Sequence, residues 1–420
     1  MRNILLFLMI ILTSSAWGQY CMDDRFGIYD TLFDPDQIIF DTDIVYGEAE
    51  NWLGESELLK LDVYRPRPSA DTLAKRPMVF YIHGGGFHAG SKSNPKGKGW
   101  AEAFSRRGYV FVSIDYRVGW PVEDTCYADQ DDYIRAVYRA AQDTRAAYRY
   151  MIEHADDYAI DTAWTFLMGA SAGGGLSFFT PYYTEEDFAP WLSEELGPLE
   201  YFSNDLTHPI NPKAVVTRAA AVDNLDLLDR RDIPHLLFHG NCDLTVPYNY
   251  GPLFWCFSPS PFFPVHGSGD IADRFEELDR CYINYKSLGN GHVGIADDSV
   301  VLFSAPFFKD IMCGDCETIR YERPSGKNIC RENSTARTWS ASLLWPNPTD
   351  TEVEIVLDGP FDEVIPLRLI DYAGRPAIET FVDFVGPTML IKLDVSELPA
   401  GVYVVQAGNR IKQARLLVVR

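Results

Sequence analysis

The 420-residue sequence predicts an α/β fold with a mainly parallel central sheet, followed by a small all-β sandwich domain. Between residues 59 and 312, short β-rich runs alternate with helical stretches, which is typical of parallel strands joined by crossover helices. Beyond residue 343, short alternating segments separated by Pro, Gly and Asp indicate strands and turns. A hydrophobic fraction of 46% is enough for a sizeable core.

The first residues have the order of a secretory signal peptide. Arg2 gives a positive start, an unbroken apolar run covers residues 4–12, and small or polar residues follow as far as Gly18. We expect cleavage near Gly18, so residues 1–18 form the signal. A membrane anchor would need about 20 apolar residues, and no transmembrane segment is expected after cleavage. Tyr20 stands where a lipoprotein signal needs a small residue, so lipid modification of Cys21 is not expected.

Apolar runs in the first part of the chain predict buried strands, and one amphipathic stretch predicts a helix. The strand candidates are residues 77–82, 109–114, 164–168, 235–238 and 282–285. Apolar residues recur at helical spacing over residues 131–155, and acidic residues open this stretch, as the helix dipole prefers.

The composition changes after Cys330. Residues 331–342 are polar and rich in Ser and Thr, which is typical of a linker. The predicted domains are therefore 19–330 and 343–420. The strand candidates of the second domain are residues 352–357, 365–370, 389–393, 402–407 and 413–419.

Charge and cysteine content limit the partners and the compartment. A net charge of −23 argues against nucleic acids and anionic membranes, because both would repel this surface. In an exported chain an even set of cysteines favours disulfides, with a connectivity that the sequence leaves open. The pair Cys313 and Cys316 resembles a redox or zinc motif, but no second pair or flanking His completes a metal site. The cysteines are Cys21, Cys126, Cys242, Cys256, Cys281, Cys313, Cys316 and Cys330.

Ser171 lies in a turn of small residues in the pattern G-x-S-x-G. An apolar strand candidate precedes this turn, and we expect a helix after it. Glycines on both sides let the chain turn sharply, so that the Ser hydroxyl projects at a helix N-terminus. A second motif, three glycines after His83, follows the strand candidate 77–82. Backbone N–H groups in such a loop can stabilise a tetrahedral oxyanion. An ordinary turn and a phosphate loop are the alternatives, but no nucleotide-binding motif supports the latter.

An acid and a base follow Ser171 in the order that such a site requires. A Ser hydroxyl needs a His to remove its proton and a carboxylate to hold that His. Asp243 lies in a loop after one strand candidate, and His292 lies in a glycine-rich loop after another. The alternatives are a turn role for Asp243 and His266 as the base; His239 fits less well because it flanks a strand. We expect Ser171, Asp243 and His292 to form a catalytic triad.

The motifs at 82–86 and 169–174 resemble those of the carboxylesterase and hormone-sensitive-lipase-like branch of the α/β-hydrolases. This resemblance covers roughly residues 59–312. It implies an α/β-hydrolase fold and a serine esterase. Because water hydrolyses the acyl-enzyme of such an enzyme, we expect no metal or organic cofactor. Ala170 departs from the pattern, since many relatives have Asp there, and Cys242 beside the acid suggests a disulfide. The residues that carry over are Ser171, Asp243 and His292 as the triad, and Gly85, Gly86 and Ala172 as the oxyanion hole.

Three segments of the C-terminal domain, 344–349, 370–375 and 398–405, resemble the sorting domain of type IX secretion cargo from Bacteroidota-like bacteria. The resemblance implies a secreted or cell-surface protein that crosses the periplasm and then the outer membrane. Its partner would be the type IX secretion machinery. A general β-sandwich binding module, such as one for carbohydrate, is the alternative.

Two segments rich in aromatic residues, 178–202 and 248–263, lie near the predicted catalytic loops. They favour either a pocket for aromatic or polymer-linked esters, or a lid with its own small core. Two other functions stay open. A prolyl-oligopeptidase-type peptidase would use the same triad, although residues 19–60 are too few for its propeller. A non-catalytic adhesion protein on an esterase fold is the other.

Overall fold

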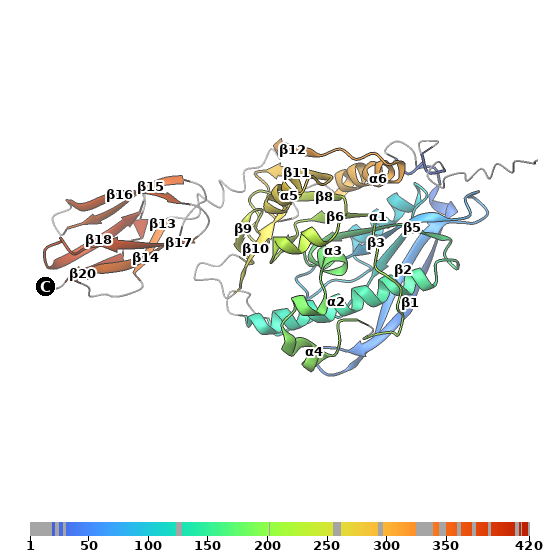
Figure 1. Ribbon diagram of the computed structural model, residues 1–420, viewed down its shortest axis with the longest axis horizontal. Helices are drawn as coiled ribbons and strands as arrows, with labels where there is room; N and C mark the ends of the chain where they lie inside the picture. The colour runs from blue at the N-terminus through green and yellow to red at the C-terminus, as the bar shows by residue number, and fades with distance from the viewer. Residues whose placement is uncertain are drawn as a thin grey trace, which may run out of the picture.

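The computed structural model shows the predicted order of a sheet-containing α/β part followed by an all-β part (Figure 1). The predicted signal peptide, residues 1–18, lies outside the residues that the structure describes. The described residues are 19–21, 25–27, 31–122, 128–200, 202–254, 262–292, 297–324, 339–343, 350–358, 363–371, 375–384, 388–407, 411–412 and 414–418.

A nine-stranded sheet forms the centre of the first part, in the order β1-β2-β4-β3-β5-β6-β8-β11-β12. The strands from β4 to β12 pair in parallel, whereas β1 and β2 pair antiparallel at one edge. The predicted α/β fold with a mainly parallel sheet is therefore confirmed. The strand bounds are β1 (Ile38–Glu50), β2 (Ser56–Pro66), β3 (Arg76–Ile82), β4 (Val110–Ile114), β5 (Ile160–Ala170), β6 (Ala214–Arg218), β8 (His235–Gly240), β11 (Tyr282–Leu288) and β12 (Ile319–Pro324).

The helices cover the sheet on both faces, which is why the central strands are apolar along their whole length. α1 and α6 pack on one face, around Trp100 and Phe308, and α2, α3 and α5 pack on the other, around Tyr148 and Leu176. Every residue of β3, β4, β6 and β8 is buried. The helices are α1 (Pro95–Ser105), α2 (Gln130–Glu153), α3 (Ala172–Tyr182), α4 (Pro190–Leu196), α5 (Ser268–Glu277) and α6 (Asp297–Cys313).

Short elements stand beside this sheet. A three-stranded sheet of order β7-β10-β9 borders α5, and the described residues also include three short 3-10 helices in loops. Their bounds are β7 (Ala221–Val222), β9 (Tyr250–Pro252), β10 (Pro264–Gly267), η2 (Pro35–Gln37), η4 (Glu185–Asp187) and η5 (Leu225–Arg230).

The C-terminal part consists of two four-stranded sheets, in the orders β17-β14-β13-β19 and β16-β15-β18-β20. Both sheets contribute to one apolar core, with Ile355 from the first and Leu369 and Val405 from the second. The predicted all-β sandwich is therefore confirmed. β13 begins inside the segment predicted as a linker. The bounds are β13 (Trp339–Leu343), β14 (Glu352–Asp358), β15 (Glu363–Ile370), β16 (Pro376–Phe384), β17 (Thr388–Asp394), β18 (Gly401–Ala407), β19 (Ile411–Lys412) and β20 (Ala414–Val418).

Disulfides tie the ends of the α/β part to its core. Cys21 is bonded to Cys313, and Cys281 is bonded to Cys316. The two cysteines of the C-x-x-C motif thus bond elsewhere rather than to each other, as expected for structural bridges. Cys242 is also disulfide-bonded. Among the described residues no helix is long and apolar enough to cross a membrane.

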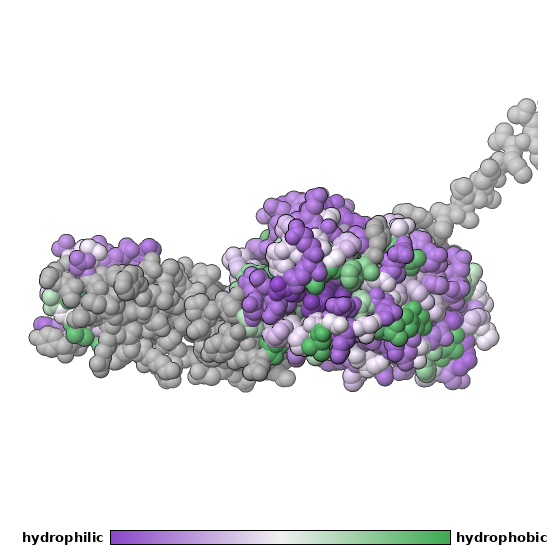
Figure 2. Space-filling model, turned by 90° about the horizontal axis from the view of Figure 1, so that it is seen from below, coloured by the Kyte–Doolittle hydropathy of each residue, from purple (hydrophilic) through white to green (hydrophobic). Residues whose placement is uncertain are grey.

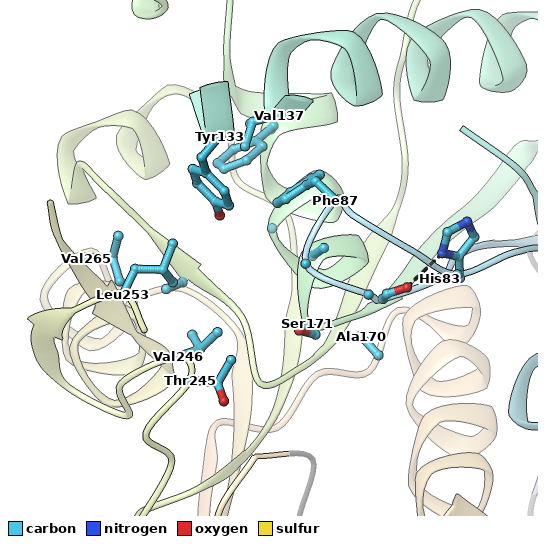
Figure 3. A pocket seen from close by; sticks show the side chains of 18 of the residues that line it. His83, Phe87, Tyr133, Val137, Ala170, Ser171, Thr245, Val246, Leu253 and Val265 are labelled. Carbon is cyan, nitrogen blue, oxygen red and sulfur yellow. Dashed lines mark hydrogen bonds between the residues drawn. The ribbon is translucent and has the colours of Figure 1, made fainter. Parts of the chain in front are cut away.

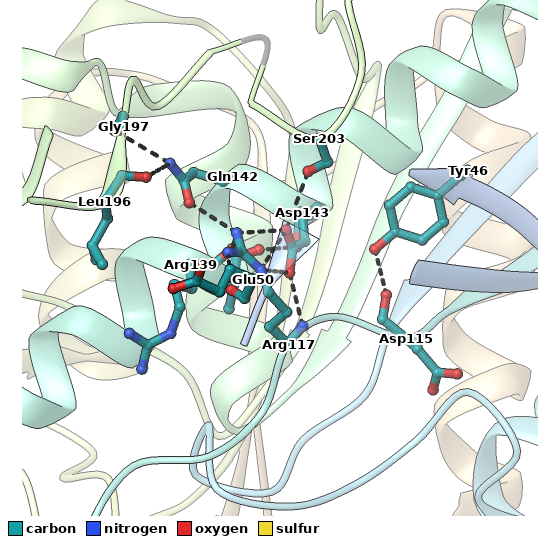
Figure 4. A network of polar contacts seen from close by, with 12 residues as sticks. Tyr46, Glu50, Asp115, Arg117, Arg139, Gln142, Asp143, Leu196, Gly197 and Ser203 are labelled. Carbon is teal, nitrogen blue, oxygen red and sulfur yellow. Dashed lines mark hydrogen bonds and ion pairs between the residues drawn. The ribbon is translucent and has the colours of Figure 1, made fainter. Parts of the chain in front are cut away.

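A buried ion pair joins the segment after β4 to helix α2 (Figure 4). Arg117 Nη2 lies 2.8 Å from Asp143 Oδ1, with both side chains almost fully buried. The guanidinium also donates to Gln142 Oε1 at 2.8 Å and to the Glu50 carbonyl oxygen at 2.9 Å. Because a buried charge needs a partner and further hydrogen bonds, this network fixes the position of the segment that includes Arg117.

One face of the α/β part illustrates how polar its surface is. Figure 2 shows that the face of the α/β part in that view is mostly hydrophilic, with small, separate hydrophobic patches. Small scattered patches are normal for a soluble domain and do not by themselves indicate a partner.

Candidate active site

Ser171 lies in the turn between β5 and α3, with a φ of 54°. Such a conformation costs about 1–3 kcal/mol for a residue with a side chain and is often found at functional sites. A Cβ on Gly169 would lie 2.1 Å from the Gly173 carbonyl oxygen, and one on Gly173 would lie 2.1 Å from that of Ile82. The Ser171 N–H donates to the Arg218 carbonyl oxygen at 2.8 Å. The two glycines thus allow a tight turn that presents Ser171 at the start of α3.

Three loops at the carboxyl edge of the sheet bring Ser171, His292 and Asp243 into one chain of hydrogen bonds. Ser171 Oγ lies 2.8 Å from His292 Nε2, and His292 Nδ1 lies 2.6 Å from Asp243 Oδ2. A carboxylate only accepts, so Nδ1 of His292 carries a hydrogen and Nε2 can accept from the Ser171 hydroxyl. This arrangement can move a proton from Ser171 to His292.

Asp243 is buried and held by four donors. Its Oδ1 accepts from the backbone N–H groups of Thr245, at 2.8 Å, and Val246, at 3.0 Å. Its Oδ2 accepts from His292 and, at 3.1 Å, from His239 Nε2. Burial alone would raise the pKa of Asp243, but the hydrogen bonds from the two histidines outweigh it and hold the pKa well below its usual range. Asp243 is therefore ionised at neutral pH.

His239 is a buried residue of the site that sequence reasoning missed, because it was interpreted only as flanking a strand. Its Nε2 faces two acceptors, Asp243 Oδ2 and the Val246 carbonyl oxygen at 3.0 Å, so this nitrogen carries a hydrogen. Its Nδ1 lies 2.9 Å from Ser268 Oγ. A histidine at the end of a strand, four residues before the predicted acid, was the signal in the sequence.

The glycine loop after β3 lies against the Ser171 turn. Gly85 and Gly86 have φ values of 131° and 62°, which disfavour other residues. A Cβ on Gly84 would lie 2.6 Å from the Ala170 carbonyl oxygen. Among the described residues, the N–H groups of Gly85 and Gly86 donate to no backbone carbonyl oxygen. They are therefore available to a ligand beside Ser171.

Aromatic side chains hold this loop in place from the segment after β4. The His83 ring stacks on Tyr116, with ring centroids 4.2 Å apart, and Tyr116 Oη donates to the His83 carbonyl oxygen at 2.9 Å. Trp120 Nε1 donates to the Gly86 carbonyl oxygen at 3.0 Å. Burial lowers the pKa of His83 to about 4, so this histidine is neutral at physiological pH. It supports the loop and does not contact Ser171 through a hydrogen bond in the described structure.

A cavity of about 770 Å³ includes Ser171 and His292 in its wall. Figure 3 shows Phe87, Tyr133 and Val137 on one side of the space, with Val246 and Leu253 across it. The two aromatic segments noted in the sequence both line this cavity. The aromatic residues of the lining that we call the aromatic end of the cavity are Phe87, Tyr133, Phe179, Tyr183, Phe188, Phe254 and Phe263.

The remaining sequence-predicted positions lie as follows. Ala172, the first residue of α3, and Ala170 both line the cavity. His266, the rival base, pairs with Asp270 at 2.7 Å and is not among the residues that line the cavity. Within the described residues, no group of three or more His, Cys, Asp or Glu side chains is placed to hold a metal ion.

Comparison with known families identifies two regions. Residues 61–225 match the family model BD-FAE, an esterase family of the α/β-hydrolases, and residues 343–419 match the model of the secretion system C-terminal sorting domain. The first part is therefore an α/β-hydrolase domain, and the second is a type IX sorting domain. The sorting domain makes this a secreted or cell-surface protein.

Individual proteins are more distant. The chain is 28% identical to Gut esterase 1 of Caenorhabditis briggsae over 140 residues, which covers 32% of this chain and 23% of that protein. It is 25% identical to Lipase 1 of Geotrichum candidum over 242 residues, covering 52% and 41%. The chain thus spans less than half the length of these curated relatives.

The solved structures that this chain matches include a butyrate-bound esterase from Thermogutta terrifontis. It is 21% identical, with a TM-score of 0.45, and the match covers 65% of this chain and 94% of that one. A truncated carbohydrate esterase from gut microbiota is 17% identical, with a TM-score of 0.43, covering 68% and 99%.

Proposed function

We propose that this exported α/β-hydrolase is a serine carboxylic ester hydrolase in which Ser171 is the nucleophile, His292 the general base and Asp243 the orienting acid. The observation that carries the proposal is the unbroken hydrogen-bonded chain from Ser171 Oγ through His292 to Asp243. The strained Ser171 turn and the glycine loop beside it support the same reading. This is the geometry that nucleophilic acyl transfer requires.

The reaction follows from these positions. Ser171 attacks the ester carbonyl carbon while its proton passes to His292 Nε2, and Asp243 stabilises the imidazolium. The N–H groups of Gly85, Gly86 and Ala172 donate to the oxyanion. His292 then gives the proton to the departing alcohol oxygen, which leaves an acyl group on Ser171. Water, activated by His292, hydrolyses this acyl-enzyme and restores the site.

The aromatic end of the cavity supports an ester that carries an aromatic group. Tyr133 lies at its centre, with ring centroids 5.6 Å from Phe87, 5.8 Å from Phe254 and 6.4 Å from Phe263. Aromatic rings prefer such edge-to-face and tilted neighbours. An aromatic acyl group, either free or linked to a polymer, would be surrounded by these rings while its carbonyl carbon reaches Ser171.

Export would use both ends of the chain. Residues 1–18 would carry the protein to the periplasm, and residues 343–420 would engage the type IX secretion machinery. The enzyme would comprise residues 19–330, joined to the sorting domain by residues 331–342.

The direct test compares wild type with Ser171→Ala on nitrophenyl esters of aliphatic and aromatic acids. We expect the wild type to release nitrophenol, with higher kcat/KM for the aromatic acids, and Ser171→Ala to lose about 10⁴-fold or more in kcat. Ser193→Ala, on α4 and outside the cavity lining, is the matched control and should keep full activity. An active Ser171→Ala variant, or a folded wild type that cleaves none of these esters, would refute the proposal.

A further inference from the structure

The residues that line the cavity come from the cores on both faces of the sheet. The aromatic end lies on the face covered by α2 and α3. The other end lies on the face covered by α1 and α6, where Tyr81 and Trp100 belong to that core. Ser171 stands between the two ends, because its turn closes the carboxyl edge of β5. A substrate bound at Ser171 can therefore place one part of the ester in each end.

The end beside α1 and α6 is cationic. Lys96 and Arg218 are the only Lys or Arg residues among the described residues that line the cavity. Arg218 faces the Trp100 ring, and Lys96 shares the partner Asp297 with Arg218, so both cations belong here. The polar side chain of Asn94, the N-cap of α1, is part of the same lining. Of the carboxylates in the lining, Asp223 accepts from Tyr183 and Asp187 precedes Phe188, so both belong to the aromatic end. We call the residues Asn94, Lys96, Trp100 and Arg218 the cationic end.

Among the described side chains, one carboxylate pairs with both of these cations. Asp297, the first residue of α6, pairs with Arg218 Nη1 at 2.6 Å and lies 3.8 Å from Lys96 Nζ. It is not part of the cavity lining. Arg218 is almost fully buried, with its guanidinium 6.0 Å from the centroid of the Trp100 ring. Among the described side chains of this end, two cations and one carboxylate carry a net positive charge, in a chain whose net charge is −23.

The proposed position of the acyl group indicates which part of the ester meets this end. The aromatic end is built mainly from α2, α3 and the segments after β9 and around β10, and the proposed function places the acyl group there. The alcohol portion, whose oxygen receives its proton from His292 Nε2, is then left to face the cationic end.

We propose that the cationic end binds a carboxylate on the alcohol portion of the ester, so that the enzyme prefers esters of acidic alcohols, such as hydroxy acids or uronic-acid sugars. This inference rests on the proposed esterase function. Lys96 supplies a half-exposed ammonium, and Arg218 supplies a buried guanidinium held by Asp297. An anionic leaving group is drawn to this charge, whereas the acidic outer surface repels it.

The test uses two pairs of esters in which only one charge differs. The first pair comprises cinnamate esters of 4-hydroxybenzoic acid and of 4-hydroxybenzamide, which place a carboxylate or a neutral amide on the leaving group. We define the selectivity ratio as kcat/KM for the charged ester divided by kcat/KM for the neutral one. Differences in intrinsic reactivity cancel when this ratio is compared between protein variants.

Two substitutions should change the ratio in opposite directions. Lys96→Met keeps the aliphatic stem and should lower the ratio about two- to fivefold, as expected for a half-exposed cation. Asp297→Asn removes the competing carboxylate and should raise the ratio by a similar factor. Lys98→Met, an exposed lysine of α1 outside the cavity lining, is the matched control and should leave the ratio unchanged. Higher salt should lower the wild-type ratio.

The outcomes separate this proposal from the esterase proposal. Hydrolysis of the neutral ester, lost in Ser171→Ala, tests the esterase alone. If that activity is present but Lys96→Met and Asp297→Asn leave the ratio unchanged, the cationic subsite is refuted. A second pair, nitrophenyl esters of 4-carboxycinnamic and 4-carbamoylcinnamic acid, places the charge on the acyl group. If Lys96→Met changes the ratio for this pair instead, the assignment to the alcohol is overturned.

Discussion

The hydrogen bond from His239 to Asp243 makes a specific prediction for His239→Phe. Phenylalanine has a ring of similar size but cannot donate to Asp243 Oδ2 or to the Val246 carbonyl oxygen. Asp243 would keep three donors, the backbone N–H groups of Thr245 and Val246 and the imidazole of His292. The fold of the loop should survive, but the carboxylate that orients His292 would be held less firmly.

The structure sets the size of the effect. A hydrogen bond to a charged group contributes about 1.5–3 kcal/mol, and the three remaining donors to Asp243 offset part of that loss. We expect kcat/KM to fall about tenfold, which corresponds to about 1.4 kcal/mol. With one donor fewer, the pKa of Asp243 rises and its carboxylate becomes a stronger acceptor for His292. The acidic limb of the kcat/KM profile should therefore move to higher pH, by up to about one unit.

The assay is the pH dependence of kcat/KM on an aryl ester, with thermal unfolding measured in parallel to show that the variants are folded. His239→Gln is the rescue variant, because its amide N–H can reach the position of His239 Nε2. We expect His239→Gln to restore most of the activity and to return the acidic limb of the kcat/KM profile to its wild-type pH. If His239→Phe keeps both the rate and the limb of the wild type, or if His239→Gln behaves like His239→Phe, the reasoning about His239 is wrong.

Three further predictions concern stability and the loop that carries His292. Asp143→Asn leaves the buried Arg117 charge without its partner and should lower the free energy of unfolding by about 3–5 kcal/mol in urea titrations. Gly240→Ala would place a Cβ 2.3 Å from the Gly291 carbonyl oxygen, so kcat should fall as that loop is displaced, while the far-ultraviolet dichroism stays unchanged. Burial lowers the pKa of His235 to about 3, below its value of about 6.5 in the unfolded chain. The free energy of unfolding is therefore unaffected by this group above pH 6.5 and decreases as the pH falls below it, because the unfolded chain binds the proton first. At pH 5 the free energy of unfolding should be lower by about 2 kcal/mol than at neutral pH. His235→Phe should flatten this pH dependence in urea titrations.

The sequence predicts the parts of the fold that depend on local pattern. The buried strands at β3, β4 and β8 are continuous apolar runs, and α2 has helical periodicity with an acidic first turn. β1 and β2 were not predicted, because both mix charged and apolar residues without a clear period. β1 is the edge strand and is partly exposed, so burial does not select a regular pattern along it.

The candidate site also contains residues that the local sequence pattern predicted and residues that it did not. The chain order of Ser171, Asp243 and His292 predicted that they lie together, because each follows a strand whose carboxyl end meets the same edge. His239 and the cationic end could not be found from local pattern. His239 matters through a contact with Asp243 across a turn, and Lys96 and Arg218 lie more than 100 positions apart and meet only in the folded chain.

The disulfide between Cys21 and Cys313 has a consequence for survival outside the cell. It closes the α/β part into a covalent ring with a sequence separation of 292 residues. A protease that cuts one surface loop within this ring opens the chain but does not separate its pieces, since both remain attached to the bond. The nicked hydrolase can therefore keep its strands in one particle and stay assembled, whereas a linear chain would release a fragment at the first cut.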